Sequence, residues 1–348
     1  MQVDLTQKKI NVGLVGGGGI ASNHLKAINH HSDDLNLIAI CDTNEAALNS
    51  LSLEKSTKRY IDYLEMIDME GLDIVSICTP SGLHPEQAIL ASNKLLHVIT
   101  EKPMSILLKD GRHMVSVAKK NNTKLFVVKQ NRYNKYVSLL KEVLKNNTLG
   151  KIHLVQSNVF WTRPQSYYDE AKWRGTKKND GGALVNQASH YVDLLYWLFG
   201  PIVSLHSLTS TTRNIETEDT GVVNLKFLSG ALGTMNYSML TYPKNFEGSI
   251  TVLGEKGTVK IGGPALSCFE VWDLEDESFN EKVEDLNQEK SYDKTIGHKE
   301  YYGNVISTLR GEGKPICDGE EGLKSLEILE ATYLSSLSGQ LINIPLEI

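Results

Sequence analysis

The sequence predicts an α/β protein, with a doubly wound parallel sheet in an N-terminal domain and a large, mostly antiparallel open sheet in a C-terminal α+β domain. Three observations predict this architecture. Short apolar segments alternate with amphipathic ones in the first third of the chain, a glycine-rich turn follows the first of them, and β-type segments dominate after Gly150. At 348 residues the chain is long for a single core, so we divide it into residues 1–125 and 126–348.

The N-terminal domain is predicted from five short segments that are apolar almost without interruption. Such continuity is typical of parallel strands that are covered on both faces. The segments are 10–15, 37–41, 74–78, 96–100 and 125–128. Helices are predicted between them, including 84–93 and 105–121, and this repetition implies right-handed crossovers within one sheet.

The C-terminal domain is predicted from six strands joined by glycine-rich turns, which favour antiparallel pairing. The predicted strands are 152–160, 203–211, 221–227, 231–240, 248–253 and 258–261. We expect one inserted helix at 186–199, a solvated polar loop or sheet edge at 273–290 and two closing helices at 294–310 and 319–337.

The composition is that of an ordinary folded protein, with 41% hydrophobic and 22% charged residues. A net charge of -6 argues against a nucleic-acid partner, which would need a basic surface. The four cysteines are widely spaced and predict neither a metal site nor a redox pair. We find no apolar run long enough for a membrane span and no signal peptide, so we expect a cytoplasmic protein without a membrane partner.

The glycine-rich turn after the first strand contains Gly16-x-Gly18-x-x-Ala21 and opens the first predicted helix. Glycines at these positions permit a tight turn and a close approach of the backbone to a pyrophosphate. We therefore expect Gly16, Gly18, Gly19 and Ile20 to bind the phosphates of a dinucleotide at the helix N-terminus, as in a Rossmann domain.

Asp42 ends the second predicted strand, 21 residues beyond Ala21. A carboxylate at this position accepts hydrogen bonds from the adenosine ribose hydroxyls and repels a 2′-phosphate. No arginine follows closely, so the sequence predicts NAD as the cofactor instead of NADP. The alternative is that Asp42 is an unrelated helix cap.

Two further features carry functional side chains. The predicted strand 96–100 ends in Glu101-Lys102-Pro103, at the edge of a parallel sheet where ligands bind, and a lysine there can stabilise an alkoxide. His190 lies in the predicted helix 186–199, where Asn186 and Asp193 share its face. A neutral imidazole is a suitable proton acceptor, but spacing alone favours an ordinary core or capping histidine over a catalytic one.

Together these segments resemble the glucose-fructose oxidoreductase / inositol dehydrogenase / rhizopine-catabolism family over nearly the whole chain. The matching residues are Gly16-x-Gly18-x-Ile20-Ala21, Cys78-Thr-Pro-Ser-x-x-His84, Glu101-Lys-Pro103, Gly182-Ala-Leu, His190-x-x-Asp193 and the tail 319–326. The resemblance implies an NAD-dependent sugar dehydrogenase with Lys102 and His190 as catalytic residues.

Within the family the chain is most similar to bacterial UDP-N-acetyl-2-amino-2-deoxyglucuronate 3-dehydrogenases of lipopolysaccharide O-antigen synthesis. Segments 128–134, 173–176 and 186–190 carry this likeness. Many relatives have aspartate at the position of Asn186, and an amide cannot act as an ionised partner for His190. This departure favours the nucleotide-sugar branch, with a sugar or nucleotide sugar as the substrate.

The resemblance also implies binding residues. Those expected at the cofactor are Thr79, Pro80, His84, Glu101, Lys102, Gln130, Trp173 and Arg174, in addition to the glycine turn and Asp42. Those expected at the substrate are Lys102, Arg132, Tyr133, Asn186 and His190. A structural role remains the alternative for Arg132, Tyr133, Asn186, Trp173 and Arg174.

Other readings stay open. The enzyme could act on UDP-GlcNAc, a free sugar or inositol, could run as a 3-ketoreductase, or could recycle NAD with a 2-oxo acid. A catalytically silent NAD-binding regulator is the reading of another class, since fold alone does not fix function. Relatives pair their open sheets, so we expect a homo-oligomer, either a dimer or a tetramer.

Overall fold

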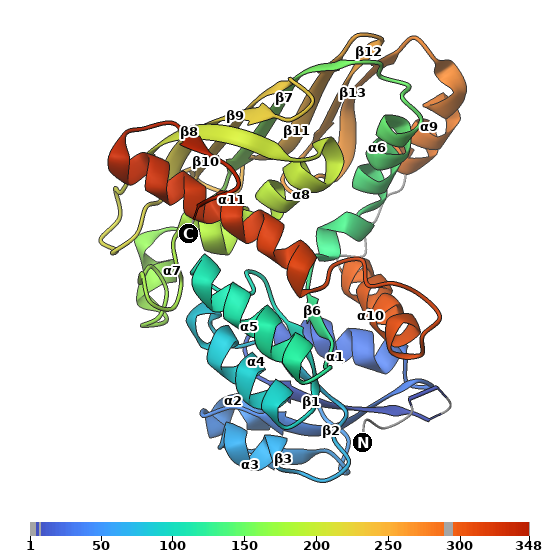
Figure 1. Ribbon diagram of the computed structural model, residues 1–348, viewed down its shortest axis with the longest axis vertical. Helices are drawn as coiled ribbons and strands as arrows, with labels where there is room; N and C mark the ends of the chain where they lie inside the picture. Colours follow the sequence, from blue (N-terminus) through green and yellow to red (C-terminus); the bar gives the residue numbers. More distant parts are fainter. Residues whose placement is uncertain (1–4, 7, 289–294, 348) are drawn as a thin grey trace. The chain divides into compact units, whose positions relative to one another are not determined.

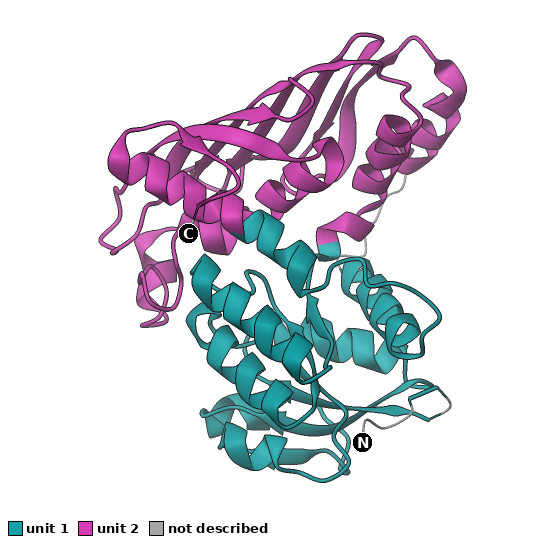
Figure 2. Cartoon of the chain, viewed as in Figure 1, with its two compact units in different colours: residues 1–130, 294–326 teal, residues 131–293, 327–348 magenta. Residues whose placement is uncertain are grey.

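The computed structural model describes residues 5–6, 8–288 and 295–347. By their internal contacts the residues form two compact units (Figure 2). The first unit comprises residues 1–130 and 294–326, and the second comprises 131–293 and 327–348. The predicted division placed everything after residue 125 in one domain, whereas 294–326 returns to the first unit. It does so because α10 (Ile296–Leu309) packs on α1 (Ala21–His30) and Asp318 bridges to Phe126.

The first unit contains a six-stranded, wholly parallel sheet with the order β3-β2-β1-β4-β5-β6 (Figure 1). Its strands are β1 Ile10–Val15, β2 Leu35–Cys41, β3 Lys58–Tyr60, β4 Ile74–Ile77, β5 His97–Thr100 and β6 Leu125–Val127. From β1 the chain adds β2 and β3 on one side of the sheet, and then β4, β5 and β6 on the other. The order therefore changes direction between β1 and β4, and ligands bind at this point in doubly wound folds. The predicted parallel sheet is confirmed, with β3 as an additional short strand.

Helices of the first unit connect these strands and pack on the sheet. They are α1 with α2 Glu45–Ser50, α3 Tyr63–Ile67, α4 His84–Asn93, α5 Leu108–Lys120 and α10. Side chains cap several of them: Asn44 accepts from the backbone N–H groups at the start of α2, and Asp62 does the same for α3. The buried face of α1 is formed by Ala21, His24, Ala27 and Ile28, so a polar ring lies among core residues.

The second unit contains an eight-stranded sheet with the order β13-β12-β11-β7-β10-β9-β8-β14. The strands are β7 Ile152–Phe160, β8 Ile202–Ser210, β9 Thr220–Phe227, β10 Leu232–Ser238, β11 Glu247–Gly254, β12 Gly257–Gly262, β13 Cys268–Leu274 and β14 Ile342–Asn343. All pairs are antiparallel except β7 with β10, which confirms the mostly antiparallel prediction.

The helices of the second unit are α6 Lys135–Lys145, α7 Gln165–Asp169, α8 Ser189–Phe199, α9 Asn280–Gln288 and the end of α11 Gly319–Ser338. Short 3-10 turns occur at Ser81–Leu83, Gln130–Tyr133 and Glu277–Phe279. Of the predicted loop or edge at 273–290, Asp273 and Leu274 lie in the edge strand β13. The prediction missed the helix α9, which begins after a turn that Asp276 caps. The predicted helix 186–199 instead begins with a π-helical turn, Leu184–Ala188, and continues as α8.

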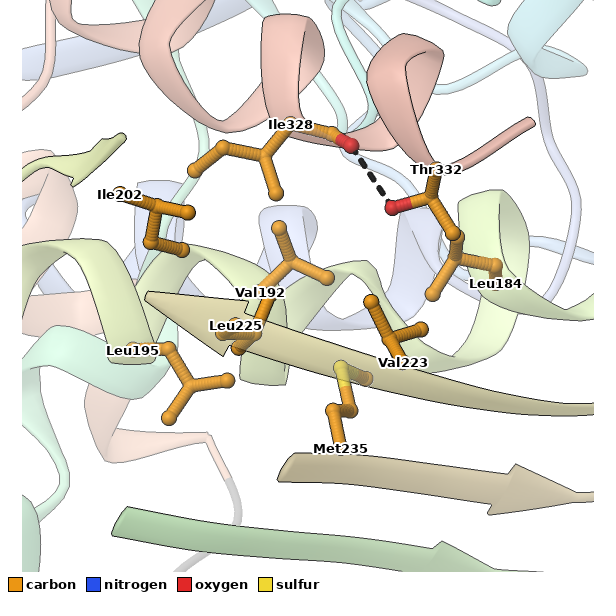
Figure 3. Close-up of a pocket in the computed structure, with 9 residues that line it drawn as sticks. All are labelled: Leu184, Val192, Leu195, Ile202, Val223, Leu225, Met235, Ile328 and Thr332. Atoms are coloured by element: carbon orange, nitrogen blue, oxygen red, sulfur yellow. Dashed lines mark hydrogen bonds between the residues drawn. The ribbon is translucent and has the colours of Figure 1, made fainter. Parts of the chain in front are cut away.

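The core of the second unit lies between the sheet and the helices α8 and α11 (Figures 1 and 3). A small cavity of about 10 Å³ remains there, with room for about one water molecule. Its lining is Leu184, Val192, Leu195, Ile202, Val223, Leu225, Met235, Ile328 and Thr332. The Thr332 hydroxyl donates to the Ile328 carbonyl oxygen at 2.8 Å, so no polar group is left for a ligand, and the cavity is a packing void.

Candidate active site

The glycine turn after β1 separates into a packed part and an open part. A Cβ on Gly16, whose φ is +96°, would lie 2.7 Å from the Cys78 carbonyl carbon and oxygen, so only glycine fits there. At Gly18 and Gly19 a Cβ would meet nothing within 4 Å. The turn is therefore held tightly against β4 while its outer backbone stays open at the N-terminus of α1, as a phosphate site requires.

Asp42 lies directly beside this turn at the end of β2. Its Oδ2 accepts from the Gly17 N–H at 2.6 Å and its Oδ1 accepts from the Asn44 N–H at 2.8 Å. The structure thus brings together the glycine turn and the carboxylate that the sequence predicts for ribose recognition. Asn44, not Asp42, caps α2.

His84 links two loops through its ring nitrogens. The ring is buried, and its nitrogens lie 2.8 Å from the Pro103 and Thr79 carbonyl oxygens. Burial lowers the pKa of His84, although these two hydrogen bonds oppose the shift. His84 therefore positions the half-buried Thr79-Pro80 segment against the Glu101-Lys-Pro103 turn. Thr79 also donates from Oγ1 to Gln87 Oε1 at 2.6 Å.

Glu101 is buried in a cluster of polar side chains from α1, β4 and α10, which we call the turn network: His24, Ser76, Glu101, His298 and Tyr302. His24 Nε2 lies 3.0 Å from Glu101 Oε1, and its Nδ1 lies 2.8 Å from the Tyr302 hydroxyl and 3.0 Å from Ser76 Oγ. Tyr302 donates to Ser76 at 3.0 Å. His298 Nε2 approaches Glu101 Oε1 at 3.5 Å.

The proton positions in the turn network follow from these contacts. Burial lowers the pKa of His24, so the ring is neutral and donates from Nε2 to Glu101 while Nδ1 accepts from a hydroxyl. Burial also opposes ionisation of Glu101, but hydrogen bonds from His24 and His298 prevail and hold its pKa well below the usual range. The other carboxylate oxygen, Oε2, accepts from the Lys102 N–H at 3.0 Å.

The turn network therefore fixes the backbone of Lys102, whose side chain is half-buried at the end of β5. Both carboxylate oxygens of Glu101 accept hydrogen bonds from protein groups, so Glu101 acts as a positioning residue. His24, Glu101 and His298 also place three possible metal-ligand atoms within 4.8 Å of one another. The hydrogen bonds already account for these three atoms.

Gln130 ends the first unit in the short 3-10 turn after β6. Its Oε1 is buried and has no hydrogen-bond partner among the described residues. A buried amide oxygen without a donor is costly, so this atom is suited to accept from a bound molecule. Gln130 therefore fits the predicted cofactor role.

In the second unit, His190 lies in the first turn of α8 and is half-buried. Asn186 precedes it in the π-helical turn and donates to Asp180 Oδ1, while the other oxygen of Asp180 accepts from the Gly175 N–H at 2.6 Å. The amide of Asn186 thus tethers the π-helical turn to the 175–180 loop. Such turns are common at functional sites because they re-aim the following helix.

Arg132, which the resemblance implies at the substrate, forms a buried ion pair within the protein. Its Nε and Nη2 donate to the two carboxylate oxygens of Asp193 at 2.9 and 2.8 Å, and both side chains are buried. The guanidinium also lies 5.5 Å from the Trp197 ring centroid. A buried bidentate pair is a structural link between α8 and the 130–133 turn. Tyr133, in the same turn, is half-buried.

Arg174 and Trp173 belong to a second polar group, which we call the arginine cluster: Arg163, Tyr167, Trp173, Arg174 and Gln187. Arg174 Nη1 donates to the Tyr167 carbonyl at 2.6 Å and to Glu170 Oε2 at 2.8 Å. Its guanidinium lies 4.1 Å from the Tyr167 ring and 5.8 Å from the Trp173 ring. Both predicted cofactor residues are thus engaged inside the second unit.

Sequence reasoning missed the turn-network residues His24, His298 and Tyr302, and also Arg163 and Gln187. His24 offered a signal, because a histidine three residues after Ala21 falls on the buried face of α1. His298 contacts Glu101 across 197 positions of the sequence, and Tyr302 contacts His24 across 278. No local sequence pattern indicates such contacts.

Comparison with known proteins places this geometry in a family. Residues 10–129 match the family model described as "Oxidoreductase family, NAD-binding Rossmann fold", and residues 141–346 match "Oxidoreductase family, C-terminal alpha/beta domain". The chain belongs to the glucose-fructose oxidoreductase / inositol dehydrogenase / rhizopine-catabolism family. The resemblance seen in the sequence is thereby confirmed, and the chain is an NAD-dependent oxidoreductase.

Two solved structures are similar over nearly their full lengths. The WlbA dehydrogenase from Bordetella pertussis, in complex with NADH and UDP-GlcNAcA, is 46% identical, with a TM-score of 0.93 and coverage of 98% of this chain and 99% of that one. The Chromobacterium violaceum WlbA structure, with the same ligands, is 49% identical, with a TM-score of 0.93 and coverage of 99% and 98%.

A curated relative supports the wider assignment to sugar dehydrogenases. Myo-inositol 2-dehydrogenase of Thermotoga maritima is 29% identical over 263 residues, which cover 72% of this chain and 74% of that protein. Across the part of this chain that the structure describes, no helix combines the length and apolarity needed to cross a bilayer.

Proposed function

We propose that this enzyme uses NAD to oxidise the C3 hydroxyl of UDP-GlcNAcA, in nucleotide-sugar synthesis for a lipopolysaccharide or related surface polysaccharide. The observation that carries the proposal is the likeness, at 46% and 49% identity, to two dehydrogenases that bind NADH and UDP-GlcNAcA. Other dehydrogenases of the family act on inositol or simpler sugars but match this chain at lower identity. We propose a cytoplasmic location for the reaction.

Lys102 and His190 are the proposed catalytic pair. His190 takes the hydroxyl proton as a general base, and Lys102 donates a hydrogen bond to the same oxygen and stabilises its alkoxide character. NAD, when bound, accepts the hydride at nicotinamide C4. The turn network supports this role for Lys102, because Glu101 Oε2 accepts from the Lys102 N–H and so fixes the lysine backbone.

The cofactor residues proposed from the sequence fall into two groups. Gly18, Gly19, Ile20, Asp42 and Gln130 offer open backbone, a carboxylate beside the turn or a buried acceptor, and we propose that they contact NAD directly. His84 and Glu101 act behind the site by holding Thr79, Pro80 and Lys102 in place.

A panel of UDP-sugars tests the proposal through NADH absorbance at 340 nm. We expect turnover with UDP-GlcNAcA, and weaker or no turnover with UDP-GlcNAc, UDP-glucose and myo-inositol. Preferential oxidation of myo-inositol or a free sugar would overturn the substrate assignment. If NAD binds and no compound of the panel is oxidised, the silent regulator becomes the better account.

We also propose that the enzyme is a homo-oligomer, a dimer or a tetramer, whose subunits pair through the outer face of the eight-stranded sheet. Leu154, Leu232 and Leu253 are adjacent on this face, since Leu154 pairs with both others, and they are 37%, 56% and 37% exposed. Leu208 and Val222 form a second exposed pair, at 63% and 45%. Contiguous exposed apolar side chains of this kind mark interaction surfaces.

Light scattering at micromolar concentration tests this assembly. We expect a multimeric mass for the wild type and a monomeric mass for Leu232→Lys, because a lysine would leave a charge unpaired in the interface. A monomeric wild type would contradict the proposal.

A further inference from the structure

The arginine cluster contains one guanidinium whose charge the protein leaves uncompensated. Arg163 follows β7 and is half-buried. Nη2 donates to Gln187 Oε1 at 2.7 Å, and Nη1 donates to the Thr162 carbonyl at 2.8 Å and to Asn245 Oδ1 at 3.5 Å. All of these acceptors are neutral. Its Nε is buried and has no partner among the described residues.

Three other arginines of the described residues each have a carboxylate partner. Arg132 pairs with Asp193, Arg174 with Glu170, and Arg310 with Asp34 at 2.7 Å. No carboxylate of the residues that the structure describes forms such an ion pair with Arg163. A half-buried charge without a counter-charge is costly, so an anion that arrives with a ligand would be bound strongly.

Aromatic rings and an amide hold the Arg163 guanidinium in one orientation. Its central carbon lies 5.5 Å from the Trp161 ring and 5.2 Å from the Tyr167 ring. Gln187 uses its Oε1 for Arg163 and donates from Nε2 to the Tyr167 hydroxyl at 3.2 Å. Nε–H has no acceptor and lies on the same edge of the planar group as Nη2, and this edge of a guanidinium suits bidentate binding of a carboxylate.

Arg163 is anchored close to the proposed catalytic base. Gln187 belongs to the π-helical turn Leu184–Ala188, three residues before His190. Three residues of helix rise about 4.5 Å, which is close to the width of one pyranose ring. A sugar that presents a hydroxyl to His190 would therefore carry a substituent from across its ring toward Arg163.

We infer that Arg163 recognises the sugar carboxylate of the substrate, and thereby selects a uronic acid over the corresponding sugar with a CH₂OH group. This inference rests on the proposed function and names the residue that gives the enzyme its selectivity for an acidic sugar. Two neighbouring guanidiniums, Arg163 and Arg174, share the Tyr167 ring, and only Arg174 has a carboxylate partner in the protein. The carboxylate of the ligand supplies the partner that Arg163 lacks in the protein.

Titration calorimetry on the NADH-loaded protein tests this inference with two ligands, UDP-GlcNAcA and UDP-GlcNAc, which differ only in the carboxylate. For Arg163→Met we expect the Kd of UDP-GlcNAcA to rise about 30- to 100-fold, the loss of one bidentate charge-assisted contact. The Kd of UDP-GlcNAc should stay within about threefold of the wild-type value. Arg163→Lys should bind the acid with intermediate affinity, because lysine keeps the charge without the fork.

Arg213→Met is the matched control, since Arg213 is also half-buried with a buried, unpartnered Nε. We expect it to leave the preference for the acid unchanged, and both variants to keep the NADH affinity of the wild type. An equal loss of both ligands in Arg163→Met would overturn the inference and point to a phosphate contact. A selective loss in Arg213→Met would assign the carboxylate to that residue instead. If the wild type prefers neither UDP-sugar over myo-inositol, the proposed function itself fails.

Discussion

The turn network of the first unit is built from buried polar side chains and the arginine cluster of the second from half-buried ones. The two also differ in how completely the protein satisfies their hydrogen-bonding groups. In the turn network, Glu101 receives His24 and the Lys102 N–H, and His24 is bonded at both ring nitrogens. In the arginine cluster, Arg163 has only neutral acceptors and an unpartnered Nε.

This difference separates positioning from binding. Most polar atoms of the turn network satisfy each other, and among its described atoms His298 Nδ1 is the buried exception. The network therefore stabilises the fold and fixes Lys102, the proposed catalytic lysine. A group left unsatisfied reduces the stability of the ligand-free protein, and that loss is recovered when a ligand binds. The comparison therefore assigns Glu101 to the scaffold and Arg163 to the substrate.

The largest expected effect comes from removing the centre of the turn network. Glu101→Leu leaves the His24 Nε2–H and the Lys102 N–H buried without acceptors, at about 1–3 kcal/mol each, so unfolding free energy should fall by roughly 2–6 kcal/mol. Arg163→Met should change it by less than about 1 kcal/mol, since its hydrogen bonds and ring contacts are offset by the unpaired charge. Urea denaturation of both variants measures the contrast.

Glu300→Leu, an exposed glutamate two residues after His298, serves as the control and should change stability by less than about 0.5 kcal/mol. Equal losses for Glu101→Leu and Arg163→Met would break the comparison. Elemental analysis of purified protein adds a second check, because stoichiometric zinc or iron held by His24, Glu101 and His298 would replace the hydrogen-bond account of the network.

A carboxyl group of the second unit falls between these two extremes. Glu218 accepts from the Leu184 N–H at 2.8 Å and from the Tyr333 hydroxyl at 2.9 Å, but burial outweighs these bonds and raises its pKa to about 7. Because the folded-state pKa lies above the unfolded one, Glu218 favours folding below about pH 4.5, and this contribution is lost as the pH rises through 7.

We expect the stability of the wild type to lose on the order of 3 kcal/mol from this group between pH 4.5 and pH 8. Glu218→Gln is neutral throughout and should lack that component, so its advantage over the wild type should grow as the pH rises. Thermal unfolding of both proteins across this range measures it. Parallel curves would show that the carboxyl titrates normally.

The glycine turn sharpens the comparison on a smaller scale, because it too has a satisfied part and an open part. Gly18→Ala adds a methyl group where the protein has no atom within 4 Å, so unfolding of the ligand-free protein should change by less than about 1 kcal/mol. The same methyl group would stand in the path of the pyrophosphate, so we expect the Kd of NAD to rise about tenfold. Fluorescence titration with NADH checks this, and an unchanged affinity would place the phosphates elsewhere.

Much of this protein can be predicted from its sequence where local pattern is sufficient. The parallel strands were marked by apolar runs, and the glycine turn with Asp42 was marked by its spacing. The strand β3 was not predicted, because Lys58 and Arg59 are exposed and only three of its residues pair. The helix α9 was not predicted, because Val283 is its one buried residue and the segment therefore has no apolar periodicity.

The site was harder to predict because its contacts connect distant segments. Asp193 shares a helix face with His190, yet its carboxylate binds Arg132, 61 positions away. That pairing engages the Arg132 guanidinium within the protein, and no local pattern in the sequence indicates it. Arg163 carries no sequence signal, since its significance lies in having no carboxylate partner, and a missing contact becomes visible only in three dimensions.

The central claim is that Lys102 acts on the C3 hydroxyl of the sugar while NAD accepts the hydride from C3. Single-turnover absorbance at 340 nm, with NAD-saturated protein and UDP-GlcNAcA, tests it most directly. The wild type should form NADH, and Lys102→Ala should form it at least about 1,000-fold more slowly, with NAD affinity within about threefold of the wild type. NADH formation by Lys102→Ala at close to the wild-type rate would contradict the account.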